Sequence, residues 1–190
     1  QTSLTLDRGA KLNVDNAFTM EDTDSTLTVV PGSGFEDTQI TAGSAQLQGL
    51  LNVDTSGLTR AGQIDRNDRY VIVRSRTAIT NDFSTVSFGG QTSGVDYLLL
   101  GGRIDPGDLS YSVGLELAWT SQSSQAVGTF TLTNPDDVFE VDVTLDDNTY
   151  SPIPNWNGRD LTKNGAGTLI LSAANGYTGT TTVNGGLLSL

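Results

Sequence analysis

Carboxylate side chains are the groups in this sequence with the most evident capacity for chemistry. The 190-residue chain has 22 acidic and 10 basic residues and contains neither histidine nor cysteine. It therefore lacks the Ser-His and Cys-His pairs of most nucleophilic hydrolases, but two carboxylates could still cleave a glycosidic bond. Adjacent residues of a strand point to opposite faces, so solvated turn acids are the favoured interpretation and no enzymatic activity is expected. The candidate pairs are Asp136-Asp137, Glu140-Asp142 and Asp146-Asp147.

Two acidic runs have the oxygen-rich composition that calcium requires. They are Glu21-Asp22-Thr23-Asp24 and the run from Asp142 to Asp146-Asp147. Neither run has the spacing or the glycine of an EF-hand loop, and neither repeats aspartate as a calcium-binding β-roll does. We therefore expect no metal and no cofactor.

Arginines form the one local excess of positive charge. Five of the 10 basic residues are Arg60, Arg66, Arg69, Arg74 and Arg76. Guanidinium groups pair well with carboxylate and sulfate, so this cluster could bind an acidic glycan of a host surface. Pairing with Asp65, Asp68 and other nearby acids is the favoured alternative. The net charge of -12 disfavours nucleic acid and anionic membranes as partners, since both would repel the chain.

The C-terminal segment, 161–190, indicates how the chain is folded. Short apolar segments alternate with Asn-Gly or Gly-Gly steps, which accept the left-handed backbone of tight corners. Leu169 and Leu171 recur as Leu188 and Leu190, a short period of the kind seen in stacked repeats. So short a segment must stack on a neighbour to bury its apolar face. The pattern predicts an all-β protein, a parallel β-helix.

Residues 1–56 show a similar rhythm. Short alternating segments such as Leu4-x-Leu6 and Leu12-x-Val14 are bounded by turn residues. The steps from Leu6 to Leu27 and from Leu27 to Leu47 are similar to the C-terminal period. We therefore expect β-helix rungs in 1–56 and again in 149–190.

Residues 57–148 have longer strands and local turns, which predict a hairpin-rich section. Asp105-Pro106-Gly107-Asp108 is a turn signal, followed by an alternating strand from Tyr111 to Thr120 with one polar or small face. Trp119 is in phase with the apolar positions of this strand, so its indole should be buried. A second alternating strand is expected over 139–145.

The residues of these segments also resemble a known family. The string Lys163-Asn164-Gly165-Ala166-Gly167-Thr168-Leu169 and the segments at 175–183 and 185–188 resemble the passenger-associated transport repeat of bacterial autotransporters, the proteins of type V secretion. Upstream, the segments at 95–98, 118–120 and 128–132 resemble the autochaperone region of these passengers. The resemblance covers roughly 60–190.

This resemblance implies a fold and a role. The fold would be a right-handed single-stranded parallel β-helix whose hairpin-rich autochaperone section caps the stack. The segment would act as a folding seed for the remainder of a passenger that crosses the outer membrane through a β-barrel translocator. The whole protein would be a cell-surface adhesin or a self-associating, biofilm-forming virulence protein. Because the chain opens at Gln1 without a signal peptide and ends within a repeat, we expect it to be a fragment of a longer protein.

Two other classes remain open, a polysaccharide-degrading β-helix enzyme and a phage tail fibre or spike fragment. A carboxylate cleft would favour the first, and a stable homotrimer the second. The residues expected to carry structure and folding are Tyr111, Leu115, Leu117, Trp119, Phe130, Trp156, Gly167, Leu169, Leu171, Tyr177 and Gly179.

Overall fold

The computed structural model describes residues 2–31, 38–54, 69–89, 92–105 and 107–190. The predicted all-β class is confirmed, since the only helix in these ranges is the short 3₁₀-helix η2, Ala118–Thr120. None of the described residues lies in a helix with the length and hydropathy of a membrane span. The chain divides into two compact units, 1–92 with 100–115 and 93–99 with 116–190. Two of the divisions between the units fall within strands β8, Leu98–Ile104, and β9, Ser110–Leu117.

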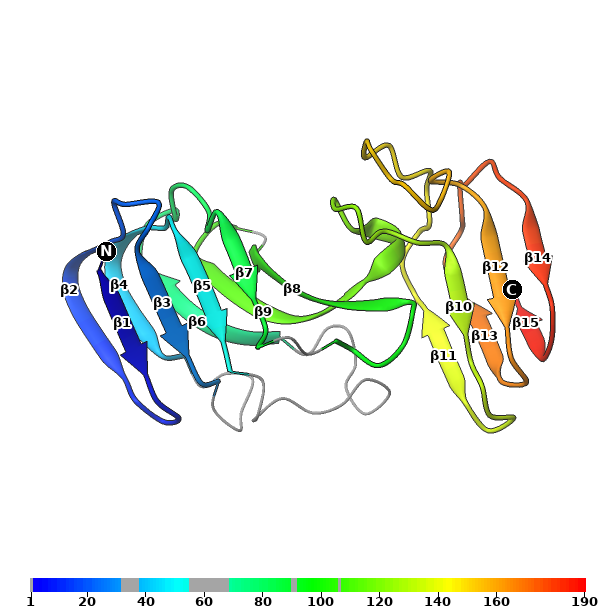
Figure 1. Ribbon diagram of the computed structural model, residues 1–190, viewed down its shortest axis with the longest axis horizontal. Coiled ribbons are helices and arrows are strands. Elements are labelled where there is room, and N and C mark those ends of the chain that lie inside the picture. Colours follow the sequence, from blue (N-terminus) through cyan, green and yellow to red (C-terminus); the bar gives the residue numbers. More distant parts are fainter. Residues whose placement is uncertain (1, 32–37, 55–68, 90–91, 106) are drawn as a thin grey trace. The chain divides into compact units, whose positions relative to one another are not determined.

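The first unit consists of two sheets to which successive strands contribute in turn (Figure 1). One sheet has the order β1-β3-β5-β7, and all of its strands are parallel. The other has the order β2-β4-β6-β9-β8, in which β2, β4 and β6 are parallel. The bounds are β1 Ser3–Leu6, β2 Leu12–Thr19, β3 Thr26–Val29, β4 Ile40–Gln46, β5 Leu50–Val53, β6 Arg69–Ser75, β7 Thr85–Ser87, β8 Leu98–Ile104 and β9 Ser110–Leu117. We call one strand of the first sheet and the following strand of the second sheet a rung.

The register of these rungs corrects the period expected for the N-terminal residues. Leu4 pairs with Leu27 and Leu27 with Leu51, so each rung is longer than the expected period. The step from Leu6 to Leu27 to Leu47 is wrong, because Leu6 pairs with Val29 and Leu47 lies beyond the end of β4. Leu47 is nevertheless fully buried, which is why its spacing resembled a repeat.

In the described part of 57–148, strands that pair in parallel stand beside one hairpin, and the hairpin-rich section stays a prediction. Among the described residues, β8 and β9 form one hairpin around a turn in which the Asp108 N–H donates to the Asp105 carbonyl at 3.0 Å. β9 then pairs antiparallel with β6. β6 itself adds in parallel to β4, and β7 in parallel to β5. The section therefore extends the rungs and is closed on one sheet by a hairpin.

The expected strand from Tyr111 to Thr120 is shorter and more buried than its sequence suggested. β9 ends at Leu117, and Trp119 lies in η2. The face expected to be polar is not exposed, because Ser112 and Gly114 are both buried. Tyr111 belongs to the apolar core of the first unit, while Ser112 contacts the polar side chains of Arg69 on β6 and Asp105 in the turn after β8.

The core of the first unit is apolar and continuous through both sheets. Phe83 packs edge-on against Tyr111, with ring centroids 4.9 Å apart. The fully buried aliphatic members come mainly from inward positions of both sheets, in accord with the period of two in a strand. They are Leu27, Val29, Ile40, Leu47, Leu51, Val53, Val73 and Val113.

The second unit repeats the arrangement with shorter rungs (Figure 1). Its sheets have the orders β10-β12-β14 and β11-β13-β15, and every pair is parallel. Leu169 pairs with Leu188, so the period predicted for the C-terminal segment is confirmed. The bounds are β10 Thr129–Thr131, β11 Val138–Val141, β12 Leu161–Asn164, β13 Thr168–Leu171, β14 Thr181–Val183 and β15 Leu187–Ser189.

The strand expected over 139–145 is wrong in its length. β11 ends at Val141, and Val143 is 43% exposed although Leu145 is fully buried. Beyond β11 the chain leaves the stack and returns at β12. For this reason the step from Phe130 to its partner Lys163 is much longer than the step from Lys163 to its partner Val183.

Glycines form the corners of the second unit, as the Asn-Gly steps predicted. Gly158 and Gly165 have positive φ values of 81° and 78°, which favour glycine. At Asn184-Gly185-Gly186 the left-handed residue is Gly186, with φ 67°. Gly176 is not among the glycines with positive φ, so the step at Asn175 turns by other means. There the Asn175 side chain accepts the Leu145 N–H at 2.9 Å.

Candidate functional site

An aromatic cluster in the second unit joins three segments that are distant in sequence. Trp119 is 1% exposed, which confirms the predicted burial of its indole. Its ring meets Trp156 at a centroid distance of 4.7 Å and Tyr177 at 5.1 Å. Its Nε1–H donates to the Asp146 carbonyl at 2.7 Å. The cluster therefore links η2, the excursion after β11 and the C-terminal repeat.

Asn148 reinforces this link from the polar side. Its amide nitrogen donates to the Trp119 carbonyl at 2.7 Å and to the Ser121 carbonyl at 2.9 Å. Its own backbone N–H donates to the Gly158 carbonyl at 2.7 Å. One residue thus holds both ends of the excursion against the segment that contains η2.

Two aspartates fasten the loop before β14 to preceding segments. Asp147 accepts the Thr178 N–H at 2.7 Å and the Thr178 hydroxyl at 2.8 Å, and these bonds hold the pKa of its carboxyl below the usual value. Asp160 accepts the Thr180 N–H at 2.8 Å. Gly179 lies between them, and a Cβ there would strike the Arg159 carbonyl and the Asp160 carboxylate. The loop therefore requires glycine at this position.

Lys163 occupies an inward position of β12 and is fully buried. Its ammonium donates to the carbonyls of Asn164, Gly165 and Gly185, at 2.8, 2.9 and 3.1 Å. Burial lowers the pKa of the Lys163 amine. Since Gly185 belongs to the next rung, this side chain connects two successive corners of the stack.

The segment 93–99 covers the edge of β10, the first strand of its sheet. Asp96 accepts the backbone N–H of Thr131 at 2.9 Å and also its hydroxyl. Tyr97 stacks on Phe130 at a centroid distance of 5.8 Å, and burial followed by the charges of Asp137 and Asp96 raises its pKa. An unpaired edge invites pairing with another chain, and here Asp96 occupies one of its donors.

The remaining predicted structural residues lie where their types suggest. The fully or almost fully buried members are Tyr111, Leu115, Leu117, Phe130, Leu169 and Leu171. Gly167 is also buried, and a Cβ there would meet the carbonyls of Asp137 and Asn134. Trp156 and Tyr177 are half-buried, as is Gly179. Their roles in folding remain predictions.

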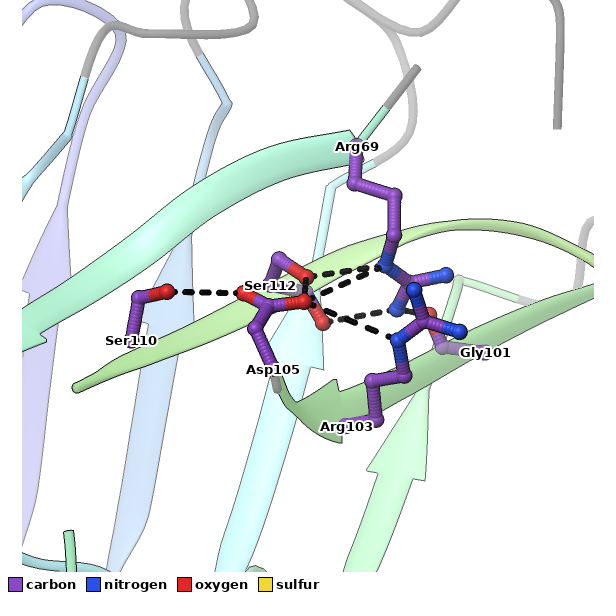
Figure 2. A network of polar contacts seen from close by, with 6 residues as sticks. All are labelled: Arg69, Gly101, Arg103, Asp105, Ser110 and Ser112. Carbon is purple, nitrogen blue, oxygen red and sulfur yellow. Dashed lines mark hydrogen bonds and ion pairs between the residues drawn. The ribbon is translucent and has the colours of Figure 1, made fainter. Parts of the chain in front are cut away.

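Among the described arginines of the predicted cluster, Arg69 is the buried one, and it bonds to residues of the β8–β9 hairpin (Figure 2). Its Nε donates to the Ser112 hydroxyl at 2.8 Å and lies 3.9 Å from Asp105, while Nη2 donates to the carbonyls of Ser112 and Gly101. Asp105 also accepts the hydroxyls of Ser110 and Ser112 at 2.9 and 2.6 Å. Arg69 therefore joins β6 to the β8–β9 hairpin.

Arg103, which the sequence did not single out, completes this cluster. Its Nε lies 3.6 Å from Asp105, and its side chain is 52% exposed. Figure 2 shows both guanidinium groups on one side of the Asp105 carboxylate and Ser110 on the other. Arg74 and Arg76 are exposed, whereas Arg60, Arg66, Asp65 and Asp68 lie outside the described residues. Glycan binding by the arginines remains a prediction.

The acidic candidates do not converge in the described part of the chain. No group of three or more carboxylates there could hold a metal ion. Asp137 accepts the Asn134 N–H at 2.8 Å in a turn, and Asp136 and Glu140 are exposed. The run at 21–24 is exposed throughout. Asp147 bonds to Thr178 as described above.

Together, these rungs place the chain among all-β proteins built from stacked parallel strands. Residues 161–190 match the family model of the passenger-associated-transport-repeat. The predicted resemblance to this repeat is thereby confirmed, and the second unit contains a repeat found in autotransporter passengers. No curated protein and no solved structure gives a significant match.

Several residues of this site escaped sequence reasoning. Lys163 gave the clearest available signal, because a lysine stands in an inward position directly before an Asn-Gly corner. Asp96, Asn148 and Asp105 gave none, since each acts on a partner that is distant in the sequence or lies across a sheet.

Proposed function

We propose that the chain is a passenger segment of a bacterial autotransporter, in which the second unit is a folding seed for a parallel β-helix. The remainder of the passenger and an outer-membrane β-barrel translocator are its partners, and the bacterial cell surface is its destination. The whole passenger serves as an adhesin or self-associating protein, and this segment has a structural rather than an enzymatic role.

The observation that carries the proposal is the construction of the second unit. The passenger repeat supplies β12 to β15, that is, two of its three rungs. The register is parallel throughout, so each rung presents a template to the next. The Trp119 cluster ties this repeat to upstream segments of the same unit.

Two further features suit a seed. The polar links at the corners of the unit bridge its own segments and rungs, so they can form without the first unit. The edge of β10 is partly occupied by Asp96, which reduces pairing with a foreign strand while the rest of a passenger is still unfolded.

Pulse-labelling hydrogen exchange during refolding of the whole chain tests the proposal. The amides of Thr162, Thr168 and Leu187, which bond across rungs of the second unit, should be protected first. The amides of Thr26 and Leu50 report on the first unit. Earlier or simultaneous protection of the first unit would rule out a seed in the second.

A further inference from the structure

We propose that the two corners of the terminal repeat that follow β12 and β14 together form a monovalent-cation site, and that the Lys163 ammonium is its resident cation. The site goes beyond the folding role above and does not depend on it. Its ligands are the carbonyl oxygens of Asn164, Gly165 and Gly185.

The position of Lys163 in the register shows that the ammonium is displaced from an apolar column. Lys163 lies between Phe130 on β10 and Val183 on β14. Leu161, the other inward residue of β12, is buried as expected for an aliphatic side chain. The lysine stem therefore fills a core position, while its end turns to the corner and meets only carbonyl oxygens among the described residues.

The corner collects carbonyls because of its backbone. Gly165 and Gly186 both adopt positive φ, of 78° and 67°, and at these turns the carbonyls of Asn164, Gly165 and Gly185 all reach the Lys163 ammonium. The Asn164 carbonyl also accepts the Leu132 N–H at 3.0 Å, since a carbonyl oxygen has two lone pairs. An ammonium has three donors and no acceptor, so one cation bonds to all three oxygens of the two corners.

A cation at this point also joins the rungs. Two of the carbonyls belong to the corner after β12 and the third to the corner after β14. Nearby, the Asn184 N–H donates to the Lys163 carbonyl at 2.9 Å, and the Asn184 side chain donates to that of Asn164 at 2.9 Å. Loss of the cation should therefore loosen the last rung before the others.

The first experiment removes the charge but keeps the length, with Lys163→Met. Hydrogen exchange of the Asn184 and Leu187 amides should accelerate between about tenfold and a hundredfold, the range for losing hydrogen bonds to a charged group. The Leu50 amide of the first unit serves as reference. The control is Lys11→Met, since Lys11 is an exposed lysine that also donates to a carbonyl, that of Thr38. Wild-type exchange in Lys163→Met would overturn the proposal.

The second experiment tests whether the site requires a cation or only an uncharged molecule that occupies the volume of the lost side chain. Lys163→Ala removes three methylene groups and the ammonium, which together correspond to n-propylammonium. Millimolar n-propylammonium chloride should therefore slow hydrogen exchange of the Asn184 amide in this variant and leave exchange in the wild type unchanged. n-Propanol has similar length without charge, and sodium chloride matches ionic strength. Equal rescue by n-propanol or by sodium chloride would overturn the proposal, as would no rescue by n-propylammonium in a folded variant. If Lys163→Ala does not fold, the Lys163→Met result decides.

Discussion

The two units build the same kind of rung by different means. In the first unit the spacing between paired positions of successive rungs differs from one sheet to the other. In the second unit the terminal repeat keeps nearly the same spacing in both sheets. The first relies on a continuous apolar core, and its described residues include buried polar side chains at Arg69 and Gln39. The second adds polar bonds at nearly every corner.

The difference teaches that polar bonds and apolar burial contribute to the register of the two units in different proportions. In the second unit, Lys163 bonds to a carbonyl of the next corner, and Asp147 and Asp160 of the excursion bond to N–H groups of the loop before β14. In the first unit Gln39 makes a similar link, since its amide nitrogen donates to the Val30 and Asp7 carbonyls at 2.9 and 3.4 Å, and apolar burial in the strands carries most of the register. Four substitutions can break or sharpen this comparison.

The largest effect is expected from Trp119→Ala in the second unit. Emptying this aromatic site should lower the free energy of unfolding by about 3–5 kcal/mol, measured by urea denaturation with circular dichroism. Trp119→Phe keeps a ring beside Trp156 and Tyr177 but loses the donor to the Asp146 carbonyl, and should cost about 1–2 kcal/mol. Near-equal stability of Trp119→Ala and wild type would show that the cluster does not hold the unit together.

Asp105→Ala tests the polar cluster of the first unit. The buried Arg69 guanidinium loses an ionic partner and two serine hydroxyls lose their acceptor, so unfolding free energy should fall by about 2–3 kcal/mol. The same urea titration applies. The matched control is Arg103→Ala, which removes the half-exposed partner and should change stability by about 0.5 kcal/mol. A larger loss of stability in Arg103→Ala than in Asp105→Ala would make Arg103, not Arg69, the principal partner of Asp105.

Gly179→Ala tests the tight loop of the repeat against Gly176→Ala. At Gly179 the new Cβ meets a backbone carbonyl, which cannot move aside, so a loss of about 1–3 kcal/mol is expected. At Gly176 it meets the Asp146 side chain alone, which can rotate away, and the change should be within about 0.5 kcal/mol. The measurement is the melting temperature of each variant. Equal melting temperatures would show that the loop has room for a Cβ at Gly179.

The smallest effect concerns acid stability. Because its bonds from Thr178 hold the pKa of Asp147 below the usual aspartate value, the ionised carboxylate stabilises the fold above that value, and this contribution is lost as the pH falls through the lowered pKa. Asp147→Asn should therefore have a lower melting temperature than wild type near neutral pH, and the two melting temperatures should converge in acid. Asp146→Asn removes a neighbouring charge that does not bond to Thr178. A similar convergence in Asp146→Asn would assign the effect to net charge.

The sequence predicted the fold best where rungs are regular. Leu169 and Leu188 stand in the register that their spacing indicated, because corners of fixed length preserve a constant separation. In the first unit the same reasoning chose Leu47, since burial in a turn and burial in a strand select the same residue type. Loops of unequal length remove the periodic signal from the sequence, although the strands still pair in register.

The candidate site was predicted only in its apolar part. Trp119 could be found because alternation reports burial, even though the residue proved to lie in η2. The partners of Arg69 could not be found, because Asp105 lies on a hairpin whose pairing with β6 depends on tertiary contacts. The inward position of Lys163 could be noticed in the sequence, but nothing in a local window reveals the three converging carbonyls.

One consequence follows from the direction of the polar bonds in the second unit. Lys163, Trp119 and Asn148 donate to main-chain carbonyls, and Asp147 and Asp160 accept main-chain N–H groups. Carbonyls are common to all residues and N–H groups to all but proline, so each donor or acceptor can find its counterpart on a neighbour of almost any sequence. As far as these bonds are concerned, a rung of this type can be duplicated, exchanged or inserted without a compensating polar side chain in the rung beside it. Such rungs are suited to lengthening a protein during evolution by the copying of short gene segments.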